Sequence, residues 1–289
     1  MTTDQTLHTV PTLAFPPLRP TLAVPPTKIA DETWVIHQVQ DACGQPLQVY
    51  INSMVIRGAE PVIVDTGTVA NRAQWLDDVF GLVDPADVRY VFISHDDVDH
   101  TGNLAQVMEH CPNATLLASW ALVERFSNAF AFPLHRCRWV DDGSHLDLDD
   151  RRLHFVRPPL WDSPTTRGVF DTSTDVYWAA DAFATPCSTA VEASVDELDP
   201  EAWRGGVAMF AHHALSPWLA MVDNGRYRHH VEQVRALGAT TIASAHSPLI
   251  TGASVATAFD LLVDLPNVEV PPAPDQAVLD AIVSQLPAA

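Results

Sequence analysis

The order of apolar and polar residues along the chain predicts an α/β fold. Short apolar runs rich in Val, Ile and Tyr predict β-strands that are buried on both faces. These runs span residues 34–40, 48–56, 61–64, 88–93, 136–140, 152–157, 176–180 and 240–244. Apolar residues at helical spacing fall between many of these runs. The predicted helices span residues 73–80, 103–110, 120–126, 199–211, 225–237 and 254–264.

Proline marks both ends of the chain. Residues 1–30 contain six prolines, which predict an extended arm, and they lack the basic and apolar regions of a signal peptide. Residues 266–289 combine a proline-rich connector with a short amphipathic helix at 276–286. We therefore expect one domain over residues 31–265, with the arm before it and the connector and C-terminal helix after it.

Polar residues that can bind metals follow four of the predicted strands. Asp65, His95, Asp181 and His246 each stand at the end of an apolar run. In a layered α/β sheet the carboxyl ends of the strands meet along one rim, so we expect these four side chains to converge. Their positions span most of the chain, and a site built from them requires a single interleaved domain.

Charge and composition narrow the function. The chain has 16 Lys and Arg against 36 Asp and Glu, which gives a net charge of −20. This shortage of bases argues against a nucleic-acid-binding surface and against a polybasic membrane anchor. No apolar run approaches the roughly 18–20 residues that span a membrane. The cysteines are scattered without a CxxC pair, which favours reduced thiols in a bacterial cytoplasmic protein.

The densest candidate chemistry lies at residues 94–103, with the sequence SHDDVDHTGN. Residues 95–100 hold two imidazoles and three carboxylates between a predicted strand and a predicted helix. Imidazole and carboxylate together suit divalent iron, manganese or zinc. The alternative is a solvated acidic loop in which Asp99 or Asn103 caps the following helix. The density of ligand-type side chains favours a metal site.

This segment resembles the metallo-β-lactamase superfamily. Sequences of that family place an Asp after one strand and an H-x-[HED]-x-D-H motif after another, and the order fits from about residue 52 to residue 252. The resemblance implies a four-layer αβ/βα sandwich with a dinuclear metal site on its rim. It also implies that Asp65 organises the ligands. The implied ligands are His95, Asp97, Asp99, His100, the bridging Asp181 and the final His246.

Two positions depart from the hydrolases of that superfamily. Asp97 stands where hydrolases usually have His, and a carboxylate there resembles the flavodiiron and oxygen-binding diiron branch, which usually carries Glu. That branch also has a His in the segment that corresponds to residues 158–167, which contain none. Three explanations stay open. Asp162 replaces the imidazole, His212 or His213 folds in, or one metal position is weak or empty.

The resemblance implies a non-haem diiron oxidoreductase that reacts with dioxygen or nitric oxide. The expected cofactors are two divalent metal ions, with iron favoured over zinc or manganese. One ion is expected at His95, Asp97 and Asp162, and the other at Asp99, His100 and His246, with Asp181 as a bridge. Flavodiiron proteins carry a flavodoxin domain after this core. The chain leaves no room for one after residue 252, so we expect a separate redox partner.

Two other functions fit the same residues. A metallohydrolase would use the metals to generate hydroxide near neutral pH, oriented by Asp99, and to polarise a small ester, lactone or thioester. A diiron oxygen or redox sensor would signal to a partner protein through the proline-rich arm or the C-terminal helix. The arm also favours a homodimer. The oxygen-rich ligand set favours the diiron oxidoreductase, because carboxylates shift a site from zinc towards iron or manganese.

Overall fold

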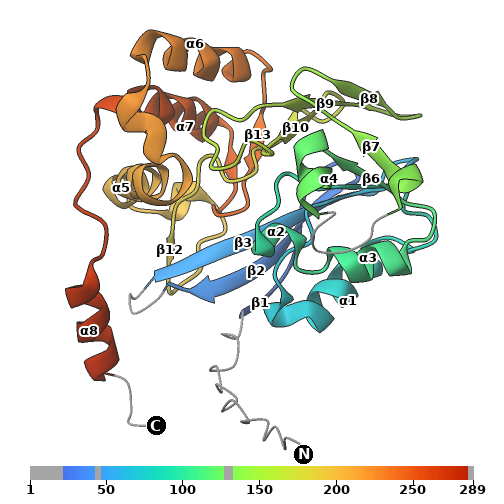
Figure 1. Cartoon of the computed structure of the whole chain (residues 1–289), viewed down its shortest axis with the longest axis horizontal. Helices are drawn as coiled ribbons and strands as arrows, with labels where there is room; N and C mark the ends of the chain where they lie inside the picture. The colour runs from blue at the N-terminus through green and yellow to red at the C-terminus, as the bar shows by residue number, and fades with distance from the viewer. Residues whose placement is uncertain (1–21, 43–46, 127–132, 286–289) are drawn as a thin grey trace, which may run out of the picture.

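Two β-sheets pack face to face in the computed structural model, which describes residues 22–42, 47–126 and 133–285. Helices α1, α3 and α4 lie on the side of the N-terminal sheet, and α5, α6 and α7 lie on the opposite side, against the other sheet (Figure 1). The longer helices are α1 (Arg72–Leu82), α3 (Leu104–His110), α4 (Trp120–Phe126), α5 (Pro200–Phe210), α6 (Asn224–Arg235), α7 (Ala253–Asp264) and α8 (Gln276–Gln285).

The N-terminal sheet has the strand order β1-β2-β3-β4-β5-β6-β7, and β12 pairs with β3. Neighbours from β1 to β4 are antiparallel, whereas those from β4 to β7 are parallel. The parallel strands send their carboxyl ends to one edge of the sheet. The strands are β1 (Leu22–Ala30), β2 (Thr33–Asp41), β3 (Leu47–Ile56), β4 (Val62–Val64), β5 (Tyr90–Phe92), β6 (Thr115–Ala118), β7 (Cys137–Trp139) and β12 (Cys187–Ser188).

The second sheet has the strand order β14-β13-β11-β10-β9-β8. β11 and β13 are parallel, and the other neighbours are antiparallel. The chain therefore leaves β11 and β13 at the same edge of this sheet. The strands are β8 (His145–Asp147), β9 (Arg152–Val156), β10 (Gly168–Asp171), β11 (Val176–Trp178), β13 (Thr241–Ala243) and β14 (Ile250–Thr251).

Alternation along each strand divides its side chains between two cores. In β4, Val62 and Val64 face the space between the sheets, while Ile63 packs in the core beneath α1 and α3. In β11, Trp178 belongs to the core between the sheets, while Tyr177 packs with residues of α5, α6 and α7. Both faces of these strands are buried, which explains their continuous apolar sequences. The predicted four-layer αβ/βα sandwich is confirmed.

The expected N-terminal arm needs a correction. Residues 22–30 form β1, which pairs antiparallel with β2 at the edge of the sheet. Pro25 and Pro26 fall where the pairing register shifts between Val24 and Thr27. An edge strand tolerates proline at such a shift because its outer N–H groups need no partner in the sheet. The rest of the expected arm, residues 1–21, lies outside the described residues.

A second difference concerns residues 170–175, whose sequence FDTSTD is rich in the Asp, Thr and Ser residues that favour a turn between strands. Phe170 and Asp171 belong to β10, and only the residues after them turn towards β11. The Asp171 carboxylate is buried because Arg151 Nη1 lies 2.8 Å from its Oδ2. An acidic residue inside a buried strand requires such a partner, and the partner comes from a segment 20 residues earlier.

The turn that follows the SHDDVDH segment packs directly against the loop after β4. The backbone N–H of Gly102 donates to the carbonyl of Gly67 at 2.9 Å. A Cβ atom on Gly102 would lie 2.6 Å from that oxygen, 2.8 Å from Val69 N and 2.9 Å from Val98 O. All three atoms belong to the backbone and have little freedom to move. This contact holds the end of the SHDDVDH segment against the loop that follows Asp65.

Replacing Gly102 with Ala is therefore expected to lower the free energy of unfolding by about 1–3 kcal/mol, the usual cost of overpacking. Urea denaturation of both proteins measures the change. Gly81→Ala is the control, because nothing lies within 4 Å of a Cβ at that exposed position in α1. There the helix propensity of Ala is expected to raise the stability by about 0.5–1 kcal/mol. Equal effects of the two substitutions would contradict the packing argument.

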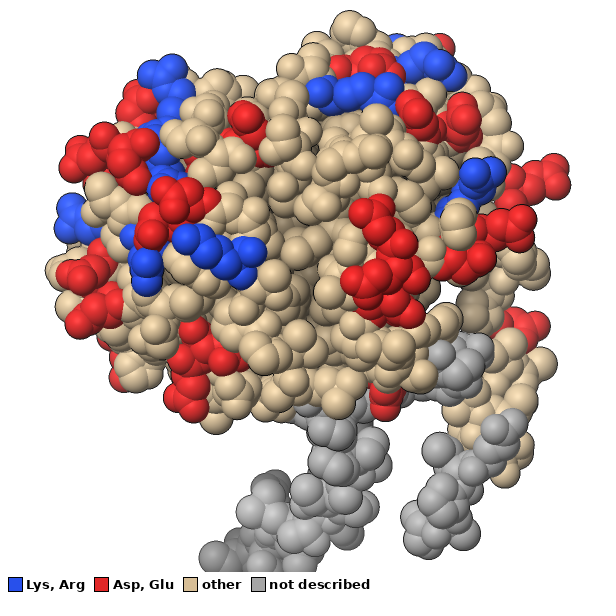
Figure 2. Space-filling model, turned by 180° about the vertical axis from the view of Figure 1, so that it is seen from behind, with Lys and Arg blue, Asp and Glu red and all other residues tan. Residues whose placement is uncertain are grey.

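Among the charged residues of the chain, Asp and Glu outnumber Lys and Arg by 36 to 16. Figure 2 shows one face, on which the basic side chains lie in small groups beside acidic ones and the visible described residues form no continuous basic track. In residues 22–42, 47–126 and 133–285, no helix is both long and apolar enough to cross a membrane.

Candidate metal centre

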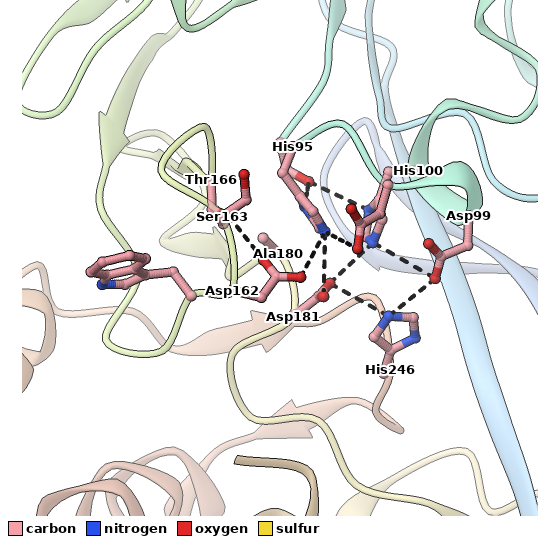
Figure 3. A network of polar contacts seen from close by, with 12 residues as sticks. His95, Asp99, His100, Asp162, Ser163, Thr166, Ala180, Asp181 and His246 are labelled. Carbon is pink, nitrogen blue, oxygen red and sulfur yellow. Dashed lines mark hydrogen bonds and ion pairs between the residues drawn. The ribbon is translucent and has the colours of Figure 1, made fainter. Parts of the chain in front are cut away.

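The site lies where the carboxyl ends of four strands meet. The chain leaves β4 at Asp65, β5 at Ser94 and His95, β11 at Asp181, and β13 at His246. Figure 3 shows the imidazoles of His95 and His246 and the carboxylate of Asp181 pointing towards one another. The predicted convergence of the strand ends is confirmed, because both sheets place these ends at the same rim.

Helix α2 (Val98–Thr101) brings further ligand-type side chains to this rim. Asp97 stands at its N-cap but makes no side-chain capping bond, so its carboxylate remains free to face the site. Asn103 stands at the N-cap of α3, and its side chain donates instead to the carbonyl of Thr66 at 2.7 Å. Neither side chain caps a helix, so the alternative in which this segment serves only as a cap does not describe the structure.

The imidazoles and carboxylates form overlapping groups whose ligand atoms lie within 4.8 Å of one another. We call the group of His95, Asp97 and Asp162 the first position. We call the group of Asp99, His100 and His246 the second position. A third group, made of His95, His100 and Asp181, connects the two.

Asp181 stands between the two positions. Its Oδ2 lies 3.4 Å from His95 Nε2, on the side of the first position. Its Oδ1 lies 3.1 Å from His100 Nε2 and 3.5 Å from His246 Nε2, on the side of the second. One carboxylate thus presents a separate oxygen to each position, which is the arrangement a bridging ligand needs.

Three buried atoms in the centre have no hydrogen-bond partner among the described residues. They are His95 Nε2, His100 Nε2 and Asp181 Oδ1. An unsatisfied buried polar atom costs about 1–3 kcal/mol, so such atoms rarely gather in one place without a ligand. Imidazole nitrogen and carboxylate oxygen are both metal ligands, and the residues present therefore fit a pair of divalent ions.

Hydrogen bonds on the far side of each ring turn the Nε2 atoms inward. The Nδ1 of His246 faces the backbone carbonyl of Tyr50 at 2.7 Å, and a carbonyl can only accept. The Nδ1 of His100 faces Asp65 Oδ2 at 3.0 Å, which also accepts. In each neutral ring Nδ1 therefore carries the proton and Nε2 keeps its lone pair, as ligating histidines usually do.

The charged groups of the centre shift one another's pKa values. Burial by itself lowers the pKa of His100, but the carboxylates of Asp181, Asp65 and Asp99 outweigh burial and hold this pKa well above its usual value. Burial opposes charge on Asp181 too, yet the three facing imidazoles hold the pKa of this carboxyl well below its usual range. The centre thus stabilises positive charge among its carboxylates, which is the electrostatic requirement for binding cations.

Asp65 organises the centre from beneath. Its Oδ1 accepts from the Ser94 N–H at 2.7 Å, and its Oδ2 accepts from Ser94 Oγ at 2.7 Å and from Trp178 Nε1 at 3.1 Å. With the His100 contact, this buried carboxylate meets four donors. Asp65 is itself in the left-handed region, at φ 56°, a conformation that costs energy for a residue with a side chain.

Asn52 is a supporting residue that sequence reasoning missed. Its Nδ2 donates to the carbonyls of Ser244 and Ser247 at 2.9 and 3.0 Å, on either side of His246. Its Oδ1 lies 2.8 Å from Nδ1 of the buried His37. Asn52 therefore holds the loop that presents His246. The local signal was the polar pair Asn52 and Ser53 inside a mostly apolar strand, and the partners of Asn52 lie about 190 residues away.

The structure also locates the candidates for the missing imidazole. Asp162 Oδ2 lies 3.9 Å from His95 Nε2, so the carboxylate stands beside the first position. His212 Nε2 instead lies 2.9 Å from the carbonyl of Leu265, and His213 Nε2 lies 2.7 Å from that of Pro271. The two histidines hold the chain after α7 and belong to neither position. That Asp162 binds a metal stays a prediction.

Comparison with known families agrees with this arrangement. The sequence model of the ODP family beta lactamase matches residues 49–247, more than half of the chain. The chain belongs to the ODP family. The matched segment contains all the strand-end residues of the site, from Asp65 to His246.

Relatives of this ODP domain are longer proteins. Diflavin flavoprotein A 1 of Synechocystis sp. is 28% identical over 205 residues, which cover 69% of this chain and 34% of that protein. The anaerobic nitric oxide reductase flavorubredoxin of Salmonella typhi is 26% identical over 133 residues, which cover 46% of this chain and 28% of that protein. The chain thus spans about a third or less of these relatives.

Among solved structures, the ODP domain is similar to rubredoxin oxygen:oxidoreductase from the anaerobe Desulfovibrio gigas. The TM-score is 0.71 at 17% sequence identity, and the alignment covers 84% of this chain and 61% of that one. At this identity the similarity shows the fold. The match to the ODP family model confirms the resemblance to the metallo-β-lactamase superfamily and its diiron branch, and the solved structure agrees with it in fold.

Proposed function

We propose that the protein is a non-haem oxidoreductase that binds two divalent metal ions, iron favoured, and reacts with dioxygen or nitric oxide. One observation carries this proposal. Two groups of imidazoles and carboxylates meet at Asp181. Three buried atoms there, His95 Nε2, His100 Nε2 and Asp181 Oδ1, make no hydrogen bond among the described residues. The oxygen-rich ligand set supports iron over zinc, because carboxylates suit harder ions.

Each residue has a defined task in this proposal. His95, Asp97 and Asp162 would hold one ion and Asp99, His100 and His246 the other, and Asp181 would offer one oxygen to each. Two ferrous ions would supply the electrons that reduce dioxygen or nitric oxide. Asp65 keeps the proton of His100 on Nδ1, and the Tyr50 carbonyl does the same for His246. The protein thereby fixes the orientation of both rings before any ligand arrives.

The reacting molecule enters from the exposed side of the centre. The Asp97 side chain is 52% exposed, whereas His95, His100 and Asp181 are buried and form the floor. A diatomic molecule can therefore reach the ions past Asp97, while Trp178 and the core between the sheets close the other side.

Electrons are proposed to come from a separate redox protein. Support comes from the names of the similar proteins, one a rubredoxin oxygen:oxidoreductase and one a nitric oxide reductase flavorubredoxin. The first name pairs rubredoxin with oxygen in an oxidoreductase, and the second describes a nitric oxide reductase. For this chain the donor, like the reaction, is part of the proposal.

Metal analysis of protein purified without oxygen tests the proposal. The expected result is about two irons per chain, with an absorption band in the near ultraviolet that changes on exposure to dioxygen or nitric oxide. Consumption of dioxygen with NADH and an added rubredoxin-type reductase would distinguish a reductase from a sensor. Stoichiometric zinc together with hydrolysis of a lactone, ester or thioester would overturn the diiron proposal in favour of a metallohydrolase.

A further inference from the structure

The two metal positions are built from different ligands. The first position has one imidazole, from His95, and two carboxylates of its own, from Asp97 and Asp162. The second position has two imidazoles and a single carboxylate of its own. Asp181 adds one oxygen to each and does not change the difference. Carboxylate-rich sites suit hard ions such as manganese, while imidazole suits iron and zinc.

The two positions also differ in exposure. At the first position the Asp97 side chain is 52% exposed and that of Asp162 is 20% exposed. At the second position the most exposed ligand is Asp99, at 27%, while His100 and His246 are buried. Water therefore competes for the ion more effectively at the first position. An exposed site also releases its ion more readily, since fewer groups must move for the ion to leave.

Asp162 is held in place rather than left as a loose surface acid. Thr166 Oγ1 donates to Asp162 Oδ1 at 3.2 Å. Its loop is tied to the SHDDVDH segment because Thr165 Oγ1 donates to Asp96 Oδ1 at 2.8 Å. Arg125 Nε lies 2.6 Å from the other oxygen of Asp96. Asp96 thus faces away from the centre and fastens the loop that carries Asp162.

Arg157 fastens the same loop from its other side. Its guanidinium donates to the carbonyls of Ser163 and Pro164 at 3.3 and 3.1 Å, and it lies over the ring of Trp161 at 4.9 Å from the centroid. Arg125 Nη1 also donates to Ser163 Oγ at 3.3 Å, so two arginines hold the loop between β9 and β10 in a chain that is poor in bases. The independent sign of a ligand is His95 Nε2, which is fully buried, makes no hydrogen bond among the described residues and faces Asp162 Oδ2 at 3.9 Å.

We propose that the two positions bind metal unequally and in a fixed order. The second position fills first and takes iron. The first position fills later, exchanges its ion with solvent, and discriminates less between iron and manganese. This inference rests on the proposed dinuclear centre and adds a difference between its halves. Asp162, standing beside the first position in a segment that lacks a His, is the residue that creates the difference.

Titration of the metal-free full-length chain with Fe²⁺ under anaerobic conditions tests the order of filling. Calorimetry is expected to show two steps of one ion each, with affinities that differ by about tenfold or more. A competition then tests selectivity. With Mn²⁺ in about tenfold excess over Fe²⁺, the bound metal is expected to approach one manganese and one iron per chain. The paramagnetic resonance signal of Mn²⁺ and elemental analysis report this independently of activity.

Variants assign each step to a position. Asp162→Asn is expected to abolish the weak step and the manganese uptake while the tight iron step remains. Asp99→Asn is expected to remove the tight step instead. Asp97→Asn, at the more exposed ligand of the first position, repeats the first test if the Asp162 variant does not fold. Asp175→Asn is the control. It removes the same charge at an exposed position just before β11 begins, at the opposite end of that strand from the site.

The outcomes separate this inference from the proposed function. Two equal iron steps, or manganese that enters both positions or neither, would overturn the inequality and leave the dinuclear centre standing. Loss of the tight step in Asp162→Asn would also overturn the proposed order of filling, because Asp162 would then belong to the tight position. If the metal-free chain binds no divalent ion, the proposed function itself fails.

Discussion

Asp181→Asn is expected to weaken metal binding at both positions together, by more than about 100-fold, beyond the usual effect of an outer supporting residue. The reason is geometric. Asp181 Oδ2 lies beside His95 Nε2 and Oδ1 beside His100 Nε2, so one side chain serves both positions. An amide keeps the shape but removes the charge, and it turns an NH₂ group towards one of the ions. Changes at the other carboxylates affect one position each.

Calorimetric titration with Fe²⁺, together with iron analysis after gel filtration, measures this loss. Asp171→Asn is the matched control, since Asp171 is another buried aspartate of the same sheet but pairs with Arg151. That substitution is expected to cost about 1–3 kcal/mol of folding stability and to leave the metal content unchanged. If Asp181→Asn binds one ion as tightly as the unmodified protein, Asp181 does not bridge.

The sequence allowed the fold and the position of the site to be predicted because both depend on local patterns. Strands such as β4 and β5 are buried on both faces, and their continuous apolar runs make them visible without knowledge of their neighbours. The topology of parallel strands then places Asp65, His95 and Asp181 at one rim. This reasoning needed only the order of the strands and the residue type that follows each one.

What the sequence did not reveal depends on partners that are distant in the chain. The prolines of β1 disguise an edge strand, and its pairing with β2 tolerates them. Asp171 looks like a turn residue until Arg151 neutralises it inside β10. Asn52 supports the loop of His246 from a strand nearly 200 residues earlier in the chain. The contacts of Asp171 and Asn52 are specific in space, but each leaves only one polar residue as a sign in the sequence.

The missing imidazole in residues 158–167 marks the limit of the sequence argument. The sequence left three explanations open: Asp162 replaces the imidazole, His212 or His213 folds in, or one metal position is weak or empty. The fold separates them, because the loop before β10 reaches the rim while the two histidines face the carbonyls of Leu265 and Pro271. The acidity of the chain and the carboxylate beside His95 are thus parts of one feature, a centre in which carboxylates outnumber imidazoles.

Asp65→Ala is expected to lower the free energy of unfolding of the metal-free protein by about 3–5 kcal/mol, the cost of breaking a buried charged pair. The buried carboxylate accepts from the Ser94 N–H and Oγ, from Trp178 Nε1 and from His100 Nδ1. Alanine would remove the acceptor of the Ser94 N–H, the Trp178 indole N–H and His100 Nδ1. Ser94 Oγ would keep its contact to His95 Nδ1 at 3.1 Å. Urea unfolding in the presence of a chelator measures the change, because bound metal would otherwise add its own stabilisation. Asp77→Ala, at an exposed position of α1, is the control and is expected to change stability by less than about 0.5 kcal/mol.

A double-mutant cycle with Trp178→Phe shows whether the loss comes from these bonds. Alone, Trp178→Phe is expected to cost about 1 kcal/mol, since it removes one donor to Asp65 and keeps an aromatic ring in the core. In the Asp65→Ala background the same change is expected to cost much less, because the indole N–H no longer has an acceptor to lose. Fully additive costs would mean that Asp65 stabilises the fold through backbone conformation rather than through its hydrogen bonds. The Asp65 variants are also expected to bind metal at the second position about 10–100-fold more weakly, because the orientation of His100 is lost.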